Sequence, residues 1–414
     1  MNIYKKIAFY PADILLPDNV DMEKWAVIAC DQFTSQPEYW EDVKNIVSDS
    51  KSAYNIVLPE IYLNSDDTES KIDKINSTMN MYINEGLFKA YNNTFFYIER
   101  KLSSGKIRRG IVGAIDLEQY EFEPGNSAAI RATEGTVLER IPPRIKVREN
   151  ASLELPHVIL LIDDEKDLVF SSVEKKDENK IYDFDLMKNS GHITAWNCDN
   201  CEDIANKFYE LLNINYSKNN SMLFAVGDGN HSLATAKAYW NNIKKDLKDT
   251  ENHPARFALV EVENVHDNAL EFEPINRIIL NCDPQDLLEE FKQFCGASEK
   301  LQKNCQEISY VINCKVNKLY IKNPASNLAV GTLQMFLDNY ISKNKCEIDY
   351  IHGNDVVIEL SKKENSIGFL LPSMEKSDLF KTIVKDGILP RKTFSMGEAY
   401  DKRFYIEARK IKTE

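Results

Sequence analysis

One segment near the middle of the chain constrains the fold more than any other. Residues 222–232 read MLFAVGDGNHS, an apolar run that changes at once into a polar loop with glycines at 227 and 229. Glycine allows a tight turn and a close ligand approach, because it carries no Cβ. The apolar residues that follow are spaced by three and four, as on one helix face: Leu233, Ala236, Trp240, Ile243 and Leu247. The pattern predicts a strand, a glycine loop and a helix that packs on the sheet.

A glycine loop at the start of a helix is a place where an anion can bind. Successive backbone N–H groups can converge on phosphate oxygens at the positive end of the helix. Asp228, Asn230, His231 and Ser232 add polar side chains at this point. An alternative stays open, because Gly-Asp-Gly-Asn is also ordinary turn chemistry and His231 could simply cap the helix.

The loop and several other blocks resemble one protein family. GDGNHSLATAKAYW, over residues 227–240, is similar to the DGHHR-type signature of the domain-of-unknown-function 1015 family, whose members are often labelled ParB-like. Further blocks carry the same resemblance: 25–40, 130–136, 253–261, 273–277 and 389–393. The chain is therefore identified as a member of that family.

More distantly, the signature is similar to the phosphate-binding motif of ParB-type CTP-binding proteins, sulfiredoxin and a free-serine kinase. This resemblance implies that the nucleotide phosphates are held by Gly227, Asp228, Gly229, Asn230, His231 and Ser232. Many relatives have an arginine where this chain has Ser232, and one hydroxyl cannot replace a bidentate guanidinium. The missing positive charge must come from elsewhere, or phosphate binding is weaker.

Arginines in the resembling blocks are the first candidates for that charge. Arg131 and Arg277 are the better two, because each belongs to such a block. The other candidates are Arg140, Arg144, Arg148, Arg391 and Lys392. Any one of these could instead be solvated or paired with one of the many carboxylates.

Phosphoryl transfer needs a phosphate cradle, a cation and a group that handles the proton of the acceptor. Glu134 is the main candidate for the proton, and the neighbouring Thr133 and Thr136 could bind a ligand oxygen. The alternative is that Glu134 forms a structural ion pair with Arg131 or Arg140.

Three other side chains are catalytic candidates. His231 could donate to a phosphate or shuttle a proton, and Asp228 could hold a magnesium ion through water. Asp31 follows the apolar residues 26–30, where a strand end could present it to a cleft. For Asp31 we expect a helix-capping role instead.

The patterning predicts a mixed α/β fold in three parts. These are an N-terminal α/β region (1–125), a central ParB/sulfiredoxin-like unit with its phosphate loop at a helix N-terminus (126–276), and a C-terminal α/β region (277–414). Residues 95–98 and 107–115 have the pattern of a hairpin, 156–162 and 256–262 of strands, and 328–341 of an amphipathic helix.

Composition narrows the setting. The net charge of -14 argues against nucleic acid as a partner, because duplex binding relies on lysine and arginine. No run approaches the ~18 apolar residues of a membrane span, so we expect a soluble, cytoplasmic protein. The eight cysteines include one CxxC, Cys198 to Cys201, and no second pair to complete a zinc site, so we expect reduced thiols.

Residues and resemblance together predict a nucleotide- or phosphate-binding phosphotransferase or phosphatase that acts on a small hydroxylated metabolite. The expected ligand is ADP, ATP or CTP with Mg2+, and the resemblance to the free-serine kinase implies serine or phosphoserine as the metabolite. Two alternatives remain: a ParB-like nucleotide-gated binding protein without turnover, and a non-catalytic anion-sensing or assembly protein.

Overall fold

The computed structural model describes residues 2–135, 141–301 and 303–413. The chain forms two compact units, each described here by itself. Unit 1 contains Met1–Leu270 and Glu398–Glu414, and unit 2 contains Glu271–Gly397. The mixed α/β class predicted from the sequence is confirmed.

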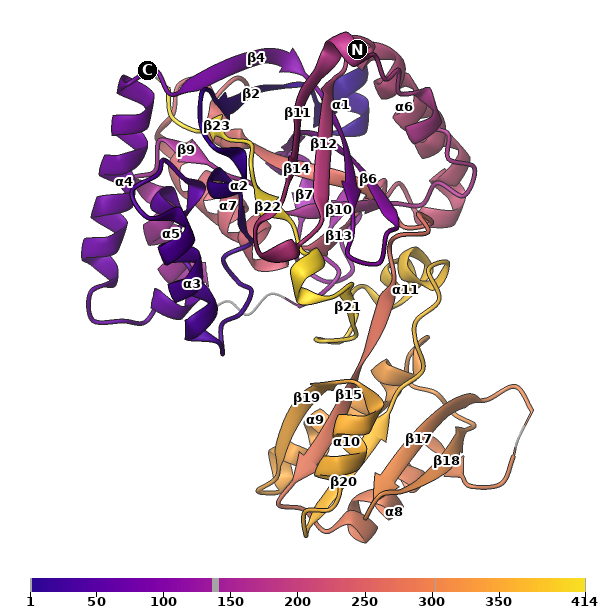
Figure 1. The fold of residues 1–414 in the computed structure, drawn as a ribbon. Helices are drawn as coiled ribbons and strands as arrows, with labels where there is room; N and C mark the ends of the chain where they lie inside the picture. The colour runs from indigo at the N-terminus through magenta and orange to yellow at the C-terminus, as the bar shows by residue number, and fades with distance from the viewer. Residues whose placement is uncertain (1, 136–140, 302, 414) are drawn as a thin grey trace. The chain divides into compact units, whose positions relative to one another are not determined.

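A mixed sheet forms the centre of unit 1 (Figure 1). Its strands lie in the order β11 (Lys180–Asp185), β12 (His192–Asn197), β5 (Phe96–Lys101), β6 (Ile107–Asp116), β14 (Phe257–Asn264), β10 (Ile159–Ile162), β13 (Phe224–Asp228), β8 (Ile130–Arg131) and β7 (Tyr120–Glu121). The short β1 (Phe9–Tyr10) also pairs with β6. Three neighbouring pairs are parallel, β10 with β14, β13 with β8 and β7 with β8, and the others are antiparallel.

Both faces of this sheet are covered, because successive side chains of a strand point to opposite faces. Phe96 and Ile98 of β5 belong to one buried core, while the neighbouring Phe95 and Tyr97 belong to another. The first core includes α2 (Met22–Trp25), α3 (Pro37–Val47), α4 (Thr68–Asn84) and β2 (Ala12–Pro17), which pairs with β4 (Phe88–Thr94). The second core includes α1 (Ile3–Ile7), α6 (Cys201–Asn219) and α7 (Asn230–Ile243). Unit 1 is therefore a sheet between two helical layers.

The local predictions around the glycine loop are confirmed. Strand β13 ends at Asp228 and helix α7 begins at Asn230. The predicted apolar stripe faces the second core: Leu233, Ala236 and Trp240 are buried there, and Ile243 and Leu247 pack against it. The hairpin β5–β6 and the strands β10 and β14 also lie where the sequence predicts them.

The division of the chain differs from the predicted one. Strands β5 and β6 of the predicted N-terminal region lie between β12 and β14 of the predicted central unit, so both regions share one sheet. The last residues return to unit 1, where β22 (Phe404–Tyr405) pairs with β3 (Val27–Ile28) and β23 (Arg409–Lys410) pairs with β9 (Leu153–Glu154). Helix α5 (Ile141–Glu149) packs against α7.

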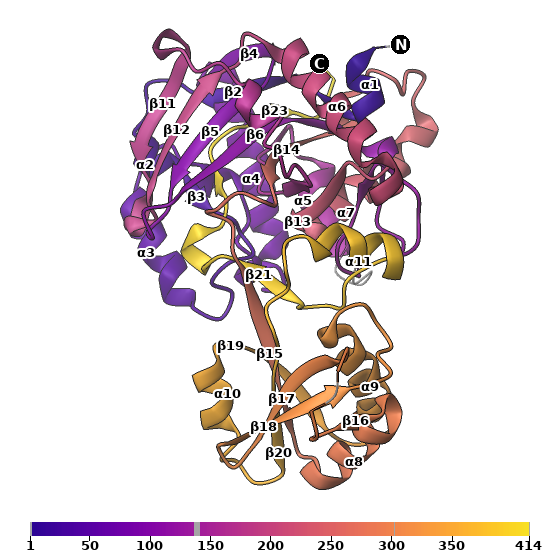
Figure 2. The ribbon, with the colours of Figure 1, turned by 90° about the vertical axis from the view of Figure 1, so that its right-hand side faces the viewer.

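Unit 2 is built on an antiparallel sheet (Figure 2). Its strands lie in the order β16 (Ala297–Ser298), β18 (Lys315–Ile321), β17 (Gln306–Ile312), β20 (Ser366–Leu370), β15 (Phe272–Leu280) and β19 (Glu347–His352), and β21 (Phe394–Met396) also pairs with β15. The helices of this unit are α8 (Pro284–Cys295), α9 (Ala329–Lys343), α10 (Asn354–Leu360) and α11 (Asp378–Asp386). Leu287 of α8 and Leu333 of α9 pack in a third buried core.

The described residues contain neither a membrane-spanning helix nor a disulfide. Among these, no helix combines the length and apolarity that crossing a membrane requires. No two of the eight cysteines, all of which lie in the described part of the chain, form a disulfide.

Candidate functional site

The turn between β13 and α7 depends on Gly229. This residue has φ of 80° and ψ of 26°, a left-handed conformation that favours glycine. A Cβ at this position would lie 3.0 Å from Cγ2 and 3.1 Å from Cα of Val158. Gly229 therefore has a close internal contact with Val158, which a Cβ would make tight.

The backbone N–H groups of the turn are only partly used within the protein. Gly229 donates its N–H to Oδ1 of Asp228 at 2.9 Å, and Leu233 donates to the carbonyl of Gly229 at 3.0 Å. Within the described residues, the N–H groups of Asn230 and Ser232 have no protein acceptor. Both residues are half-buried. These two donors, at the positive end of α7, remain available to an acceptor from solution.

The loop and the segment after β8 lie side by side. Because β8 and β13 are parallel neighbours, both chains leave the sheet at the same edge. Asn230 Nδ2 donates to Thr133 Oγ1 at 3.1 Å, and the N–H of Thr133 donates to Asn230 Oδ1 at 3.1 Å. Thr133 Oγ1 in turn donates to the carbonyl of Val226 at 2.6 Å. The side chains of Asn230 and Thr133 thus hold the two segments together.

Arg131 does not direct its charge at the loop. Its guanidinium donates to the carbonyls of Ala128 at 2.9 Å and Asn220 at 2.6 Å, and burial lowers its pKa. Arg131 therefore holds the backbone at Ala128 and Asn220. Among the described residues, Arg131 and Glu134 do not form an ion pair. Glu134 follows Thr133 and is half-buried. Thr136 and Arg140, two further candidates, lie outside the described residues.

Gly227 lies near the end of β13 and His231 in the first turn of α7, and both are half-buried. The carbonyl of His231 accepts a hydrogen bond from Thr235 Oγ1 at 2.7 Å, within the first turns of α7.

Arg277 belongs to unit 2, where it is fully buried. Its Nε donates to Gln334 Oε1 at 3.2 Å, and its Nη2 donates to the carbonyl of Arg391 at 3.0 Å. The guanidinium also lies over the ring of Tyr350, 5.1 Å from the centroid. Arg277 thus joins the blocks 273–277 and 389–393 within unit 2.

Asp228 has a basic partner that the sequence analysis missed. Nζ of Lys402 lies 3.2 Å from Asp228 Oδ2, and the side chains are 11% and 20% exposed. Burial acts to raise the pKa of Asp228, but the charges of Lys402 and His157 hold that pKa below its ordinary value. The carboxylate is therefore ionised at neutral pH. No motif marks Lys402, because it comes from the far end of the chain and lies outside every resembling block.

His157 acts electrostatically on Asp228, and its hydrogen bonds lead from there toward Asp31. His157 Nδ1 lies 2.8 Å from the hydroxyl of Tyr405, which also accepts the N–H of Cys30 at 3.2 Å. Burial raises the pKa of the Cys30 thiol to about 12, so this thiol is protonated. Arg144, which forms an ion pair with Glu60, acts electrostatically on Cys30 and Asp31.

The helix-capping role expected for Asp31 is wrong. Helix α3 begins only at Pro37, and its N-cap residue is Gln36. Asp31 instead lies in the turn that follows β3, where its Oδ1 accepts a hydrogen bond from Gln32 Nε2 at 3.0 Å. A local pattern could not show how far the turn extends before the helix starts.

Among the described residues, one group of acidic and histidine side chains has the composition of a metal site. Asp163, Glu165 and His266 lie close together beyond the end of β10. Lys218 already pairs with Asp163 at 2.8 Å and with Glu165 at 3.1 Å, and His266 Nε2 lies 2.7 Å from Asp163. Since β10 runs antiparallel to β13, this group lies at the opposite edge of the sheet from the glycine loop.

Comparison with known families decides the relationship that the sequence blocks suggest. The family model described as "Protein of unknown function (DUF1015)" matches residues 13–340. The chain belongs to the DUF1015 family. No curated protein matches it. The DUF1015 assignment itself carries no activity.

The solved structures that match this chain have low sequence identity and low TM-scores. A free serine kinase variant in complex with AMP has 11% identity and a TM-score of 0.41, covering 74% of this chain and 93% of that one. A conserved hypothetical protein from Pyrococcus furiosus has 12% identity and a TM-score of 0.37, with 72% and 94% covered. SbnI from Staphylococcus aureus, with a C-terminal truncation, has 8% identity and a TM-score of 0.40, with 71% and 85% covered. At these scores the neighbours carry no argument about the site, and they lend no support to the ParB-like label.

Proposed function

We propose that this DUF1015 protein binds a phosphate-bearing ligand, a nucleotide in particular, at the turn between β13 and α7, and transfers or removes a phosphoryl group there. The observation that carries the proposal is the Asp228–Lys402 pair beside the unused N–H groups of Asn230 and Ser232. Backbone donors at a helix N-terminus favour an anion, and a neighbouring ammonium group stabilises the charge that phosphoryl transfer spreads over oxygen atoms.

The ionised carboxylate of Asp228 is suited to magnesium. Mg2+ keeps several of its waters and binds through one or two carboxylates together with substrate phosphates. The half-buried, ionised carboxylate of Asp228 beside the proposed phosphate position fits that description. Bound magnesium would supply further charge neutralisation to the phosphates.

Two acidic side chains are the candidates for accepting the proton of a hydroxylated substrate. Glu134 follows the Thr133 segment that Asn230 holds against the loop. Asp31 follows Cys30, whose N–H donates to the Tyr405 hydroxyl, and this hydroxyl lies 2.8 Å from Nδ1 of His157, which acts electrostatically on Asp228. The motif resemblance extends the proposal to serine or phosphoserine as the small metabolite, and His231 is the candidate donor to a phosphate oxygen.

The first experiment measures binding. Calorimetric titrations of the full chain with ADP, ATP, CTP and phosphoserine, with and without magnesium, are expected to show binding of at least one phosphate compound. If none binds, at protein concentrations that detect millimolar affinity, the proposal is wrong.

A second experiment separates turnover from binding. Glu134→Gln should lower the rate of phosphoryl transfer and leave ligand affinity within about two-fold. The reason is that a neutral amide of the same shape replaces the carboxylate that would accept the proton. Glu165→Gln is the matched control, since Glu165 lies at the opposite edge of the sheet and should change neither quantity. Full turnover by Glu134→Gln would mean that another residue, such as Asp31, accepts the proton.

A non-catalytic anion sensor is the second candidate function. The observation in its favour is the rigidity of the loop, in which Asp228 accepts the Gly229 N–H and Asn230 is bonded to Thr133. A sensor should bind the same anions without consuming any of them, so product analysis after prolonged incubation with ATP and serine decides between the two functions.

A further inference from the structure

We propose that Lys402 is the cation that binds the ligand phosphate at the glycine loop, and that the C-terminal segment 398–405 forms part of the site in order to deliver it. This inference rests on the proposed function, because it names the phosphate-binding cation of the same site. Three observations support it: the charge of the loop, the use of the other cations nearby, and the way in which the segment is held.

The first observation is the charge at the turn. Asp228 presents an ionised carboxylate at the N-terminus of α7, where the phosphate is proposed to bind. The carboxylate and a bound phosphate would repel one another unless a cation lies between or beside them. Lys402 forms an ion pair with Asp228, and with only 11% of its side chain exposed it is screened less by salt than a surface lysine.

The second observation concerns the neighbouring cations. Ser232 supplies no charge, and the Arg131 guanidinium is bonded to two backbone carbonyls. Lys237, the lysine of α7, donates to the carbonyl of Leu117 at 2.8 Å and pairs with Glu121 at 3.3 Å. Neither Arg131 nor Lys237 is directed at the turn, whereas Lys402 already contacts it.

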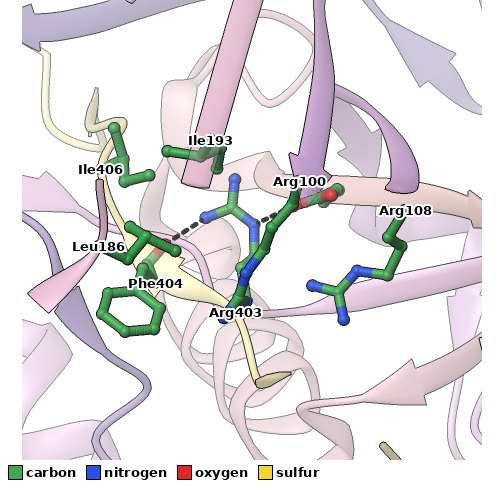
Figure 3. A pocket seen from close by; sticks show the side chains of 8 residues that line it. Arg100, Arg108, Leu186, Ile193, Arg403, Phe404 and Ile406 are labelled. Atoms are coloured by element: carbon green, nitrogen blue, oxygen red, sulfur yellow. Dashed lines mark hydrogen bonds and ion pairs between the residues drawn. The ribbon is translucent and has the colours of Figure 1, made fainter. Parts of the chain in front are cut away.

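The third observation is the anchoring of the segment by two arginines of the β5–β6 hairpin. Arg100 donates to the carbonyls of Tyr400 at 2.6 Å, Asp401 at 2.9 Å and Lys402 at 2.5 Å. Arg108, its cross-strand neighbour, donates to the carbonyl of Asp401 at 2.8 Å. Figure 3 shows both side chains extending from neighbouring strands into the region that Arg403 also occupies. Bonds to carbonyls fix the path of the backbone and leave the side chain of Lys402 to act elsewhere.

Arg403 sets the direction in which Lys402 points. Its guanidinium is buried and pairs with Glu261 at 2.7 Å and with Glu407 at 2.8 Å. The backbone of Lys402 is extended, with φ of -66° and ψ of 158°. Adjacent side chains of extended backbone point to opposite sides. The anchored Arg403 therefore turns Lys402 away from the interior of this network and toward Asp228.

The experiment titrates ADP without magnesium into the wild type, Lys402→Met, Lys402→Arg and the control Lys218→Met. Lys218 also pairs with a buried aspartate, Asp163, but at the opposite sheet edge. Removing Lys402 should weaken ADP binding about ten-fold or more, as expected for loss of a charged hydrogen bond. Lys402→Arg should restore most of the affinity, and Lys218→Met should bind as the wild type does. Adenosine, which has no phosphate, should show no difference between Lys402→Met and the wild type.

A double variant separates contact from simple charge neutralisation. In Asp228→Asn with Lys402→Met both charges are gone, so no buried ion is left without a partner and the fold is preserved. If Lys402 contacts the phosphate, the double variant stays about ten-fold weaker than the wild type. Wild-type affinity in the double variant would overturn the contact, and so would wild-type affinity in the single variant Lys402→Met. Failure of the wild type to bind any of ADP, ATP, CTP and phosphoserine would instead overturn the proposed function.

Discussion

Asn230 and Thr133 hold each other through two reciprocal hydrogen bonds of 3.1 Å, one from each residue. This pair joins the N-terminus of α7 to the segment after β8, and therefore brings Glu134 beside the glycine loop. The loop is a fixed junction of two parallel strands rather than a flexible turn. Its rigidity makes the effects of substitutions there specific.

Thr133→Val should destabilise the protein by about 1–3 kcal/mol, because it leaves the buried carbonyl of Val226 without its donor and Asn230 without its acceptor. Chemical denaturation measures the change. Thr78→Val is the control, since Thr78 donates only to Lys74 within its own helix and should cost less than about 0.5 kcal/mol. Equal effects of the two substitutions would mean that the Thr133 pair is not needed.

Gly229→Ala should cost more stability than Gly105→Ala. Both glycines have nearly the same positive φ, 80° and 81°, but a Cβ at 105 meets nothing within 4 Å. Gly105→Ala therefore measures the cost of the backbone conformation alone, about 1–2 kcal/mol. The contact with Val158 adds to this cost at 229. If Gly229→Ala is no more destabilising than Gly105→Ala, then Val158 can move to accommodate the added Cβ without loss of stability.

Arg100→Lys should loosen the C-terminal segment, because a single ammonium group cannot reproduce the bonds of the Arg100 guanidinium to the carbonyls of residues 400–402. Hydrogen exchange measured by mass spectrometry should then show faster exchange over residues 398–405, and ADP should bind more weakly. Arg109→Lys is the control, since Arg109 pairs with Asp167 and Asp267 instead. Unchanged exchange in Arg100→Lys would contradict the anchoring role.

Glu263 should make stability depend on pH. Burial raises its pKa to about 8, helped by the charges of Glu261 and Asp267 and opposed by Arg108, against an ordinary value of 4.5. Between these two values the folded protein keeps a proton that the unfolded chain has lost. The contribution of Glu263 to the free energy of unfolding therefore falls as pH rises across this window, by at most about 1.4 kcal/mol per pH unit.

Denaturation of the wild type and Glu263→Gln between pH 5 and pH 9 measures this dependence. The variant cannot ionise at 263, so its stability relative to the wild type should improve as pH rises from 5 to about 8 and then level off. A difference that stays constant across the range would show that Glu263 titrates normally.

The sequence analysis predicted well what depends on neighbours in the chain. The α7 stripe, the β5–β6 hairpin and the strand–loop–helix order around Gly229 follow from periodicity and turn chemistry. Thr133 also lies beside the loop, although the two segments are far apart in the chain. The structure explains it by the parallel pairing of β8 and β13.

Contacts between residues that are distant in the sequence could not be predicted from local patterns. Lys402 reaches Asp228 only because distant arginines hold its backbone, and no spacing in the sequence reports that. Val158 gives Gly229 its packing role from another strand. Arg131 and Arg277 are predicted from the sequence as phosphate-binding charges, because each belongs to a block that resembles the family. Their guanidinium groups nonetheless bond to backbone carbonyls of their own units, which only tertiary structure decides.

The most direct test of the central claim is a crystal structure of the full chain with ADP. We predict phosphate oxygens within hydrogen-bond distance of the N–H groups of Asn230 and Ser232, with Nζ of Lys402 on the same phosphate. ADP bound elsewhere, with the turn between β13 and α7 empty, would contradict the account.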